Sequence, residues 1–175
     1  MSKTYRIIVA THKQFQMPED KDLYIPIQVG SEGKEDLGYQ PDNQGVHISH
    51  LNPYYCELTG LYWAWKNLEC DYLGLVHYRR YFTSKRHSYR EAISMDDIIL
   101  SKSEVKNLLS KYDVVVPKKR KYYIETLYSH YAHTHDANHL DVTRQIVSEL
   151  RPDYIDAFDQ VMKQRSGYMF NMFIM

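Results

Sequence analysis

Short apolar runs recur along the chain and predict buried strands. They cover residues 5–10 (YRIIVA), 23–29 (LYIPIQV), 73–76 (LGLV) and 114–116 (VVV). Apolar runs of this length, rich in β-branched residues and bounded by polar or turn residues, are typical of strands buried on both faces. Pro26 cannot donate to a ladder, so the second strand is expected to be an edge strand or irregular at that point.

The first helix is predicted over residues 52–68. Asn52 supplies a side-chain acceptor at the N-cap, and Pro53 has the backbone angle that the first helical position requires. Four apolar or aromatic residues follow at three- and four-residue spacing and predict one face of this helix: Tyr55, Leu58, Tyr62 and Trp65.

Helical patterns also dominate the second half of the chain. Ser101 and Glu104 form a capping-box pattern, which predicts the start of a short helix. Residues 30–44 are polar and predict a long loop, and residues 83–94 predict a polar excursion. Further helices are predicted over residues 124–132, 140–150 and 152–163.

The order of the predicted elements is strand, strand, helix, strand, helix, strand, which indicates an α/β fold. A length of 175 residues predicts one domain, residues 1–175. The sequence contains neither a GxGxxG nor a Walker lysine motif, so the two commonest phosphate loops are missing. The final apolar segment GYMFNMFIM leads us to expect that the natural protein continues and that the fold is C-terminally truncated.

Charge and cysteine content narrow the class of protein. The 22 basic and 22 acidic residues cancel, which removes the bulk electrostatic case for nucleic acid as the main partner. The cysteines, Cys56 and Cys70, form neither a disulfide framework nor a zinc motif. No leader peptide and no run of ~20 apolar residues is visible in the sequence. We therefore expect a cytoplasmic protein, and docking at the inner face of a membrane stays open.

A cationic and aromatic cluster follows the third predicted strand: His77, Tyr78, Arg79 and Arg80. Ligands of open α/β sheets bind outside the carboxyl ends of the strands, and neighbouring arginines suit a diphosphate because each offers forked donors. On a strand the two arginines would point to opposite faces, so both can serve one ligand only if the backbone turns there. The alternative for the arginines is a salt bridge to a neighbouring carboxylate. His77 could contact a ligand, carry a proton or cap the strand.

Five segments of the chain together resemble one family. They are IIVATHK, YIPIQVG, NPYYCELTGLYWAWKNL, YLGLVHYRRYF and SGYMFNMFIM, and they span essentially the whole sequence. In these segments the chain is similar to the DUF4422 family, which is found in capsular and exopolysaccharide gene clusters and is regarded as a family of glycosyltransferases with a GT-A-like fold. The resemblance implies a mixed sheet flanked by helices. It also implies transfer of a sugar from a nucleotide-sugar donor to a saccharide or lipid-linked saccharide acceptor.

The resemblance further implies a donor site. In GT-A enzymes the end of the first strand meets the nucleotide base and ribose, which places Thr11, His12 and Lys13 there. The cluster that follows the third strand, Tyr78 included, would then meet the rest of the donor.

A departure from the GT-A pattern concerns the metal. A later GT-A strand usually ends in an Asp-x-Asp that holds a divalent ion on the diphosphate, whereas residues 77–80 here read HYRR. An Asp-x-Asp does occur at residues 20–22, before the second strand and so in the wrong place. Metal dependence therefore stays open. Arg79 and Arg80 could instead stabilise the charge that builds on the leaving diphosphate.

The remaining candidates are scattered along the chain. Glu57 lies near a predicted helix start, where the dipole stabilises a carboxylate, and could contact a sugar hydroxyl or act as the base for an acceptor. Asn171 could reach the same pocket. A second polar group could line the mouth of the site, or bind a metal although its spacing matches no standard motif. Its members are His130, His133, His135, Asp136, His139 and Asp141.

The leading hypothesis is a glycosyltransferase of surface-polysaccharide assembly whose catalytic residues are His77, Arg79, Arg80 and Glu57. The competing hypothesis is a non-catalytic nucleotide- or saccharide-binding module. A third, a metal-dependent hydrolase, would use the histidine-rich group instead.

Overall fold

The computed structural model describes residues 3–83 and 94–175. They form two compact units. Unit 1 comprises Met1–Val116 together with Asn171–Met175, and unit 2 comprises Pro117–Phe170. The polar excursion predicted over residues 83–94 lies, apart from its two end residues, outside the described residues.

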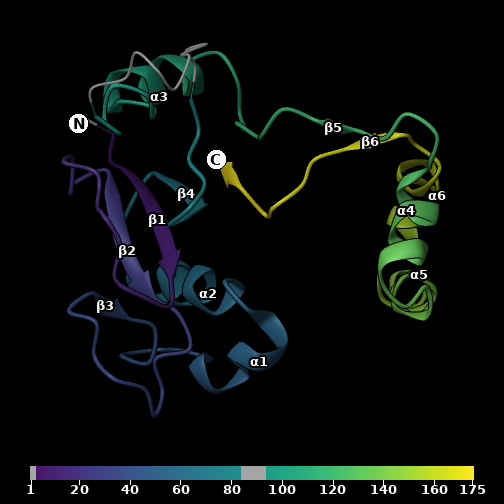
Figure 1. The fold of residues 1–175 in the computed structure, drawn as a ribbon, viewed down its shortest axis with the longest axis horizontal. Coiled ribbons are helices and arrows are strands. Elements are labelled where there is room, and N and C mark those ends of the chain that lie inside the picture. Colours follow the sequence, from purple (N-terminus) through teal and green to yellow (C-terminus); the bar gives the residue numbers. More distant parts are fainter. Residues whose placement is uncertain (1–2, 84–93) are drawn as a thin grey trace. The chain divides into compact units, whose positions relative to one another are not determined.

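Unit 1 is built on a mixed five-stranded sheet, and the sequence predicts three of its five strands (Figure 1). The strand order is β3-β2-β1-β4-β7, in which the first four strands are parallel and β7 runs antiparallel to β4. The carboxyl ends of β1, β2 and β4 therefore meet at one edge. The strands are β1 (Tyr5–Thr11), β2 (Tyr24–Gln28), β3 (Gln40–Pro41), β4 (Tyr72–His77) and β7 (Phe173–Ile174).

The strand that holds Pro26 is not an edge strand, because β2 lies between β1 and β3, but Pro26 itself is unpaired on one side. Pro26 pairs with Val9 of β1, whereas β3 pairs with β2 at Ile27 and Gln28 and does not reach the proline. One side of β2 is therefore unpaired where the amide hydrogen is missing, so no ladder bond is lost there.

Helices cover both faces of this sheet. Ile7 and Val9 of β1 belong to a core that includes Val105 of α3 (Lys102–Leu109). Ile8 belongs to a second core that includes Trp63 of α2 (Leu58–Asn67). Alternate residues of a strand point to opposite faces, so the continuous apolar run of β1 fills both cores. The predicted capping box is confirmed, because Ser101 and Glu104 exchange hydrogen bonds at the start of α3.

The single helix predicted over residues 52–68 is wrong. A short 3₁₀ turn, η1 (Ser49–Leu51), leads into α1 (Asn52–Tyr55), and the chain then breaks at Cys56, whose φ is 48°, before α2 begins. Asn52 is not the N-cap. Its side-chain amide instead donates to the carbonyl of Cys56 at 2.7 Å and so supports the break.

The break also changes which face of the helix is buried. Leu58 and Trp65, expected on one apolar face, are 37% and 65% exposed, whereas Trp63 and Gly60 pack on the sheet. A Cβ at Gly60 would lie 2.8 Å from a methyl carbon of Val29, so α2 packs closely against the residue that follows β2.

The fourth predicted strand, residues 114–116, is reduced to one bridge. Val115 exchanges two hydrogen bonds with Ile174, but Val114 and Val116 are exposed. A run of three valines meets the strand pattern, yet too little of the sheet lies beside it to bury the other two.

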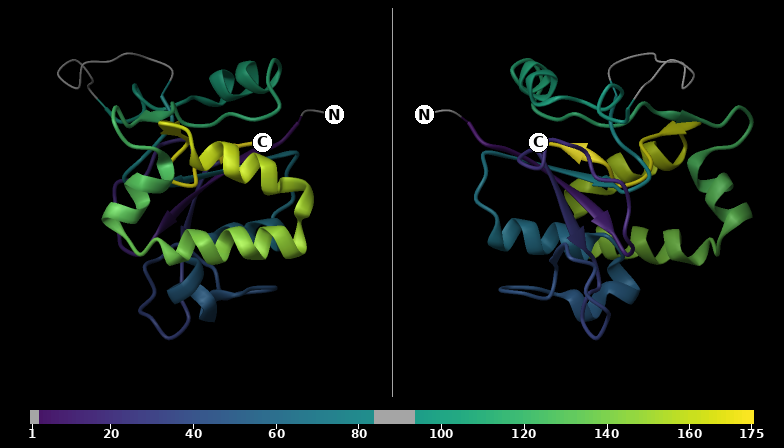
Figure 2. Two further views of the ribbon diagram at one scale, coloured as in Figure 1. Left: turned by 90° about the vertical axis from the view of Figure 1, so that its right-hand side faces the viewer. Right: turned by 60° about the vertical axis from the view of Figure 1, so that its left-hand side comes forward.

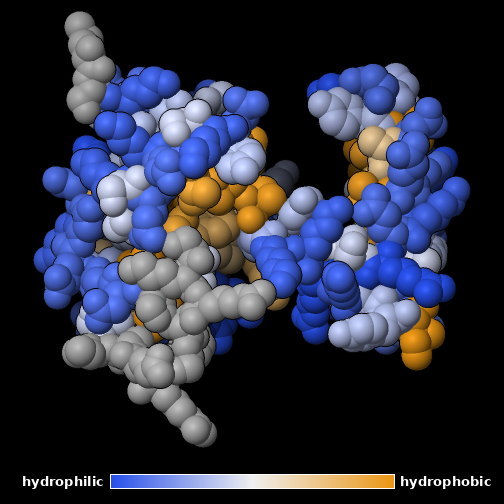
Figure 3. Space-filling view, turned by 90° about the horizontal axis from the view of Figure 1, so that it is seen from above, coloured by the Kyte–Doolittle hydropathy of each residue, from blue (hydrophilic) through white to orange (hydrophobic). Residues whose placement is uncertain are grey.

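Unit 2 is mainly helical, and its three predicted helices are confirmed with shifted ends. The chain reverses at η2 (Pro152–Tyr154), so that α6 runs back along α5 (Figure 2). None of the described residues of these helices is fully buried, and polar side chains dominate the face of unit 2 in Figure 3. The elements are β5 (Arg120–Lys121), α4 (Leu127–Thr134), α5 (Asn138–Leu150), α6 (Ile155–Met162) and β6 (Ser166–Gly167).

Within the described ranges, no helix combines the length and the apolar character that crossing a membrane requires.

Candidate functional site

A cavity of about 670 Å³ lies in unit 1 at the edge where the parallel strands end. Thr11 at the end of β1 and His77 at the end of β4 both line it, and the paired strands hold these two ends side by side. This is the edge at which open α/β sheets bind their ligands. The other lining residues are Ala10, His12, Val29, Lys34, Asn52, Cys56, Glu57, Tyr78, Arg79 and Arg80.

Residues 77–80 form a tight turn at the end of β4. The amide of His77 donates to the carbonyl of Arg80 at 3.2 Å, and the amide of Arg80 donates back to His77 at 2.8 Å. The backbone therefore turns at the two arginines, which is the condition under which both can contact one ligand. Arg79 and Arg80 both line the cavity as a result.

Tyr78 is the centre of a cationic and aromatic group. Its ring meets His12 edge to face, with centroids 5.4 Å apart. The guanidinium of Arg79 lies 5.1 Å from the ring centroid and the ammonium of Lys13 lies 5.3 Å from it. Cations at such distances are attracted by the ring quadrupole, so the aromatic ring helps to gather positive charge beside the cavity.

Among the described residues that line the cavity, Glu57 is the one carboxylate. It occupies the N-cap position of α2, and one of its oxygens accepts a hydrogen bond of 2.9 Å from the side chain of Asn171. The same oxygen lies 3.9 Å from Nε2 of His77. Asn171 can reach this carboxylate because both it and Phe170 adopt a positive φ, which turns the chain sharply before β7.

The charges of the lining residues favour an anionic ligand. Lys34, Arg79 and Arg80 contribute cations against the single carboxylate of Glu57. Arginines offer planar forked donors to phosphate oxygens, and lysine adds a point charge. A diphosphate group matches this set of donors.

Comparison with known proteins identifies the family of the chain. Residues 6–175 match the family model described as a domain of unknown function, DUF4422. The chain belongs to the DUF4422 family. A search of curated proteins found no match.

A solved structure is also similar to this DUF4422 chain: the apo structure of WbbM, a bifunctional glycosyltransferase. The two share 29% sequence identity with a TM-score of 0.84, over 98% of this chain and 34% of that protein. The DUF4422 chain thus spans about a third of the length of WbbM. The likeness confirms the expected α/β fold, with a mixed sheet flanked by helices.

Thr11 and Lys13 of this DUF4422 chain, which are expected to contact the donor, make contacts within the chain. The hydroxyl of Thr11 donates to the carbonyl of Lys13 at 2.5 Å, and Thr11 is almost wholly buried. Lys13 is not among the lining residues, and its ammonium lies near Tyr78 instead. His12 is the member of this group that is both exposed and part of the cavity wall.

Sequence reasoning missed Lys34 and Asn52 as lining residues. Lys34 belongs to the long loop after β2, and nothing in a polar loop indicates which of its residues faces a cavity. Asn52 fills space beside Gly30, whose φ is 59° and whose Cβ, if it had one, would lie 2.3 Å from Oδ1 of Asn52. Glycine at residue 30 is the signal of this close approach.

A buried carboxylate holds that loop in place. Asp42 is fully buried and accepts hydrogen bonds from the amides of Gly30 and Ser31 and from the hydroxyls of Ser31, Ser49 and Thr59. Burial alone would raise the pKa of Asp42, but the bonds from Ser49, Thr59 and the two amides outweigh burial and lower the pKa below its usual value. An ionised Asp42 therefore ties the loop to α2.

The Asp-x-Asp of the sequence lies at the end of β2 that is remote from the cavity. Residues 20–22 precede the amino end of β2, whereas the cavity is at the carboxyl ends. Asp20 accepts the amide of Leu23 at 2.9 Å and so shapes the entry to the strand.

The histidine-rich group belongs to unit 2. Nδ1 of His130 lies 2.7 Å from a Glu125 oxygen, and His133 binds the other oxygen. These bonds lower the pKa of Glu125. His130 and His135 line a second cavity, of about 590 Å³, formed within unit 2. Asp136 accepts the amide of Asn138 and helps to start α5. An acceptor-binding role for this group stays a prediction.

Proposed function

We propose that this chain is the catalytic domain of a glycosyltransferase that moves a sugar from a nucleotide-sugar donor to a saccharide acceptor. The observation that carries the proposal is the cationic cavity at the carboxyl ends of β1 and β4, next to the tight turn of residues 77–80. The likeness to WbbM, which is named as a bifunctional glycosyltransferase, supports it.

The proposed reaction breaks the bond between the anomeric carbon of the sugar and the diphosphate oxygen. The electron pair stays on the diphosphate, whose negative charge grows in the transition state. Arg79, Arg80 and Lys34 line the cavity and would supply fixed positive charge to that leaving group. His12 and Tyr78 would meet the nucleotide at the end of β1.

The acceptor hydroxyl forms the new bond to the anomeric carbon and must lose its proton. Glu57 is the candidate base, because it is the lining carboxylate and Asn171 holds it in one orientation. His77, 3.9 Å away, is placed to share the proton. We place the reaction in capsular or exopolysaccharide assembly, in the cytoplasm, with a saccharide or lipid-linked saccharide acceptor at the inner face of the membrane.

The test is incubation of the protein with a panel of nucleotide sugars and saccharide acceptors, followed by measurement of nucleotide release. We expect release that depends on the acceptor and proceeds without added Mg²⁺ or Mn²⁺. A requirement for either ion would contradict the assignment of the diphosphate to arginines. Absence of release with every donor would contradict the transferase itself.

A non-catalytic nucleotide- or saccharide-binding module is the second candidate. The sequence HYRR where a GT-A enzyme carries Asp-x-Asp favours it, because binding an anion requires cations but no catalytic metal. The same assay separates the two: a module would be stabilised against heat by a nucleoside diphosphate and would release no nucleotide from any donor.

A further inference from the structure

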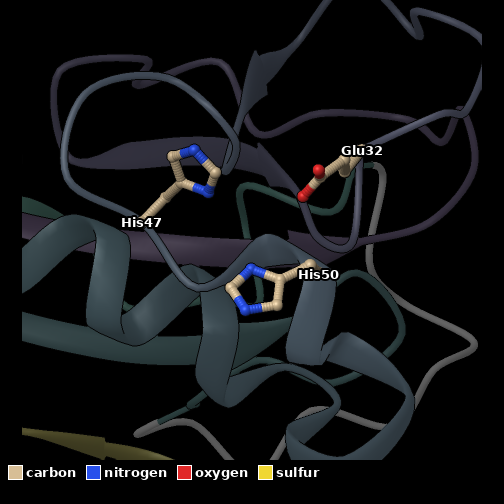
Figure 4. A group of neighbouring side chains, drawn as sticks. All are labelled: Glu32, His47 and His50. Atoms are coloured by element: carbon tan, nitrogen blue, oxygen red, sulfur yellow. The ribbon is translucent and has the colours of Figure 1, made fainter.

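A group of three metal-ligating side chains lies in unit 1 outside the lining of the cavity. The carboxylate of Glu32 and the imidazoles of His47 and His50 each offer one ligand atom, and these atoms all lie within 4.8 Å of one another. Figure 4 shows the carboxylate and both rings directed toward a common space. Glu32 and His50 are exposed and His47 is half-buried, so an ion has access from solvent.

The backbone that carries these three side chains is held by the buried carboxylate of Asp42. Ser49 lies between the two histidines, and its hydroxyl donates to Asp42 at 2.5 Å. The same hydroxyl accepts the amide of Glu32 at 3.3 Å. One buried group therefore fixes the segments on both sides of the cluster, as the outer partners of a metal site do.

The hydrogen bonding of His47 suits a ligand. The amide of Ser49 points at Nδ1 of His47 over a long 3.4 Å, which requires that this nitrogen carry a lone pair rather than a proton. An ion that bound at Nδ1 would use the same lone pair. The long bond costs little to give up when an ion arrives.

We infer that Glu32, His47 and His50 form a binding site for a divalent transition-metal ion, most suitably Zn²⁺. Imidazole and carboxylate are ligands that zinc accepts, and three protein ligands leave a fourth position for water. Tetrahedral zinc holds its ligand atoms about 3.3 Å apart, so the exposed side chains need to close by about 1.5 Å at most from the separations here. The ion is separate from the diphosphate contacts proposed for the cavity.

A bound ion would join two segments that lead into the cavity wall. Glu32 precedes the lining residue Lys34 by two positions, and His50 precedes the lining residue Asn52 by two positions. Fixing these segments reduces the freedom of the loop after β2. The expected role of the ion is therefore to position the wall of the cavity.

The histidines of unit 2 provide a matched comparison. Glu125, His130 and His133 have the same composition, but both oxygens of the carboxylate are already bonded to the two rings. An ion would have to replace those bonds. His133→Ala is thus a control that removes an exposed imidazole beside a glutamate without touching the proposed site.

The experiment measures Zn²⁺ binding by calorimetry, and Co²⁺ binding by its visible absorption, on protein without a polyhistidine tag. We expect one ion per chain, with affinity at least about 100-fold weaker in His50→Ala and in Glu32→Gln and unchanged in His133→Ala. Zn²⁺ should raise the unfolding temperature of the wild type and of His133→Ala, but not that of His50→Ala or Glu32→Gln.

Two results would overturn the inference: no Zn²⁺ binding by folded wild-type protein, or affinity that is lost in His133→Ala and kept in His50→Ala. Glu32→Gln preserves the shape of an exposed side chain, so it tests the site even if His50→Ala disturbs the turn. None of these outcomes depends on the transferase activity, which the nucleotide-release assay tests separately.

Discussion

Unit 1 and unit 2 hold their carboxylates in opposite ways. Asp42 of unit 1 is fully buried and is surrounded by amide and hydroxyl donors, whose hydrogen bonds lower its pKa. Carboxylates of unit 2 lie at the surface and pair with charged side chains, as Asp159 does with Arg144 and Asp153 does with Arg151. The first arrangement fixes loops in one geometry, whereas the second leaves its partners exchangeable with water.

The difference matters for the site. The cavity of unit 1 depends on loops after β1, β2 and β4, and loops need internal hydrogen bonds to stay in one conformation. Solvent screens exposed ion pairs, and they contribute little to stability, whereas removal of a buried carboxylate leaves its buried donors unpaired at a large cost in free energy. Unit 1 should therefore be much more sensitive to the loss of one carboxylate than unit 2.

Replacing Asp42 should have the largest effect on stability. Asp42→Ala leaves amide and hydroxyl donors of Gly30, Ser31, Ser49 and Thr59 without their acceptor, and each buried unpaired donor costs ~1–3 kcal/mol. We expect the free energy of unfolding to fall by about 4 kcal/mol in urea denaturation. Asp153→Ala, which removes an exposed carboxylate of unit 2, is the control and should leave the transition unchanged.

The pH dependence of the free energy of unfolding at acid pH tests the same carboxylate. The pKa of Asp42 is lowered on folding, so the folded protein gains stability above the unfolded pKa of about 4 and loses it as the pH falls through the lower folded value. Asp42→Asn should lack this part of the acid-induced loss. Equal pH dependence in both proteins between pH 4 and pH 2 would contradict an ionised Asp42.

The two arginines of the turn should show the next largest effect, on catalysis. Arg79→Ala and Arg80→Ala each remove fixed charge from the proposed leaving group, and we expect turnover to fall about 100-fold, or about 2.7 kcal/mol in activation free energy. Arg151→Ala in unit 2 is the matched control. Near-normal turnover in both turn variants, with folding intact by circular dichroism, would remove the arginines from the mechanism.

Alanine substitutions at two glycines of the loop after β2 should distinguish the cost of backbone strain from the cost of a steric contact. Gly30 and Gly33 both have a positive φ, but a Cβ at Gly30 would meet Asn52 whereas a Cβ at Gly33 meets nothing within 4 Å. We expect Gly33→Ala to cost about 1 kcal/mol and Gly30→Ala about 2 kcal/mol in chemical denaturation. Equal costs would show that Asn52 moves away freely.

The smallest effect should come from Glu125 in unit 2. Glu125→Gln removes the charge that pairs with His130 and His133. The side chain of His133 is 70% exposed, and those of His130 and Glu125 are 32% and 31% exposed. Solvent screens such pairs, so the unfolding temperature at pH 7 should hardly change. A loss as large as that of Asp42→Ala would erase the contrast between the two units.

Much of unit 1 could be predicted from the sequence because its signals are local. The apolar run of β1, the arginines after β4 and the capping box of Ser101 and Glu104 each identify an element or a site edge without knowledge of distant residues. The turn at residues 77–80 is a local feature as well, and the sequence raised it as a condition that both arginines required.

The failures have a different origin. The break at Cys56 is supported by a hydrogen bond from Asn52, four residues away, and the buried face of α2 is set by the tertiary approach of Gly60 to Val29. Asp42 reads as one acidic residue in a polar loop, and its donors lie up to 17 residues away along the chain. Propensity and periodicity do not register such contacts, so the wall of the cavity could not be assembled from the sequence.

The placement of β7 has a consequence for how the protein folds during synthesis. Phe173 and Ile174 pair with β4, and Asn171 reaches Glu57, yet the whole of unit 2 is made between these residues and the rest of unit 1. At ~5–20 residues per second, the ribosome takes roughly 3–10 s to make that insertion. For those seconds β4 has an open edge that could pair with other chains, and Glu57 lacks its amide partner. Slower translation of unit 2 should therefore lower the yield of soluble protein, whereas protein that has already been completed should be unaffected.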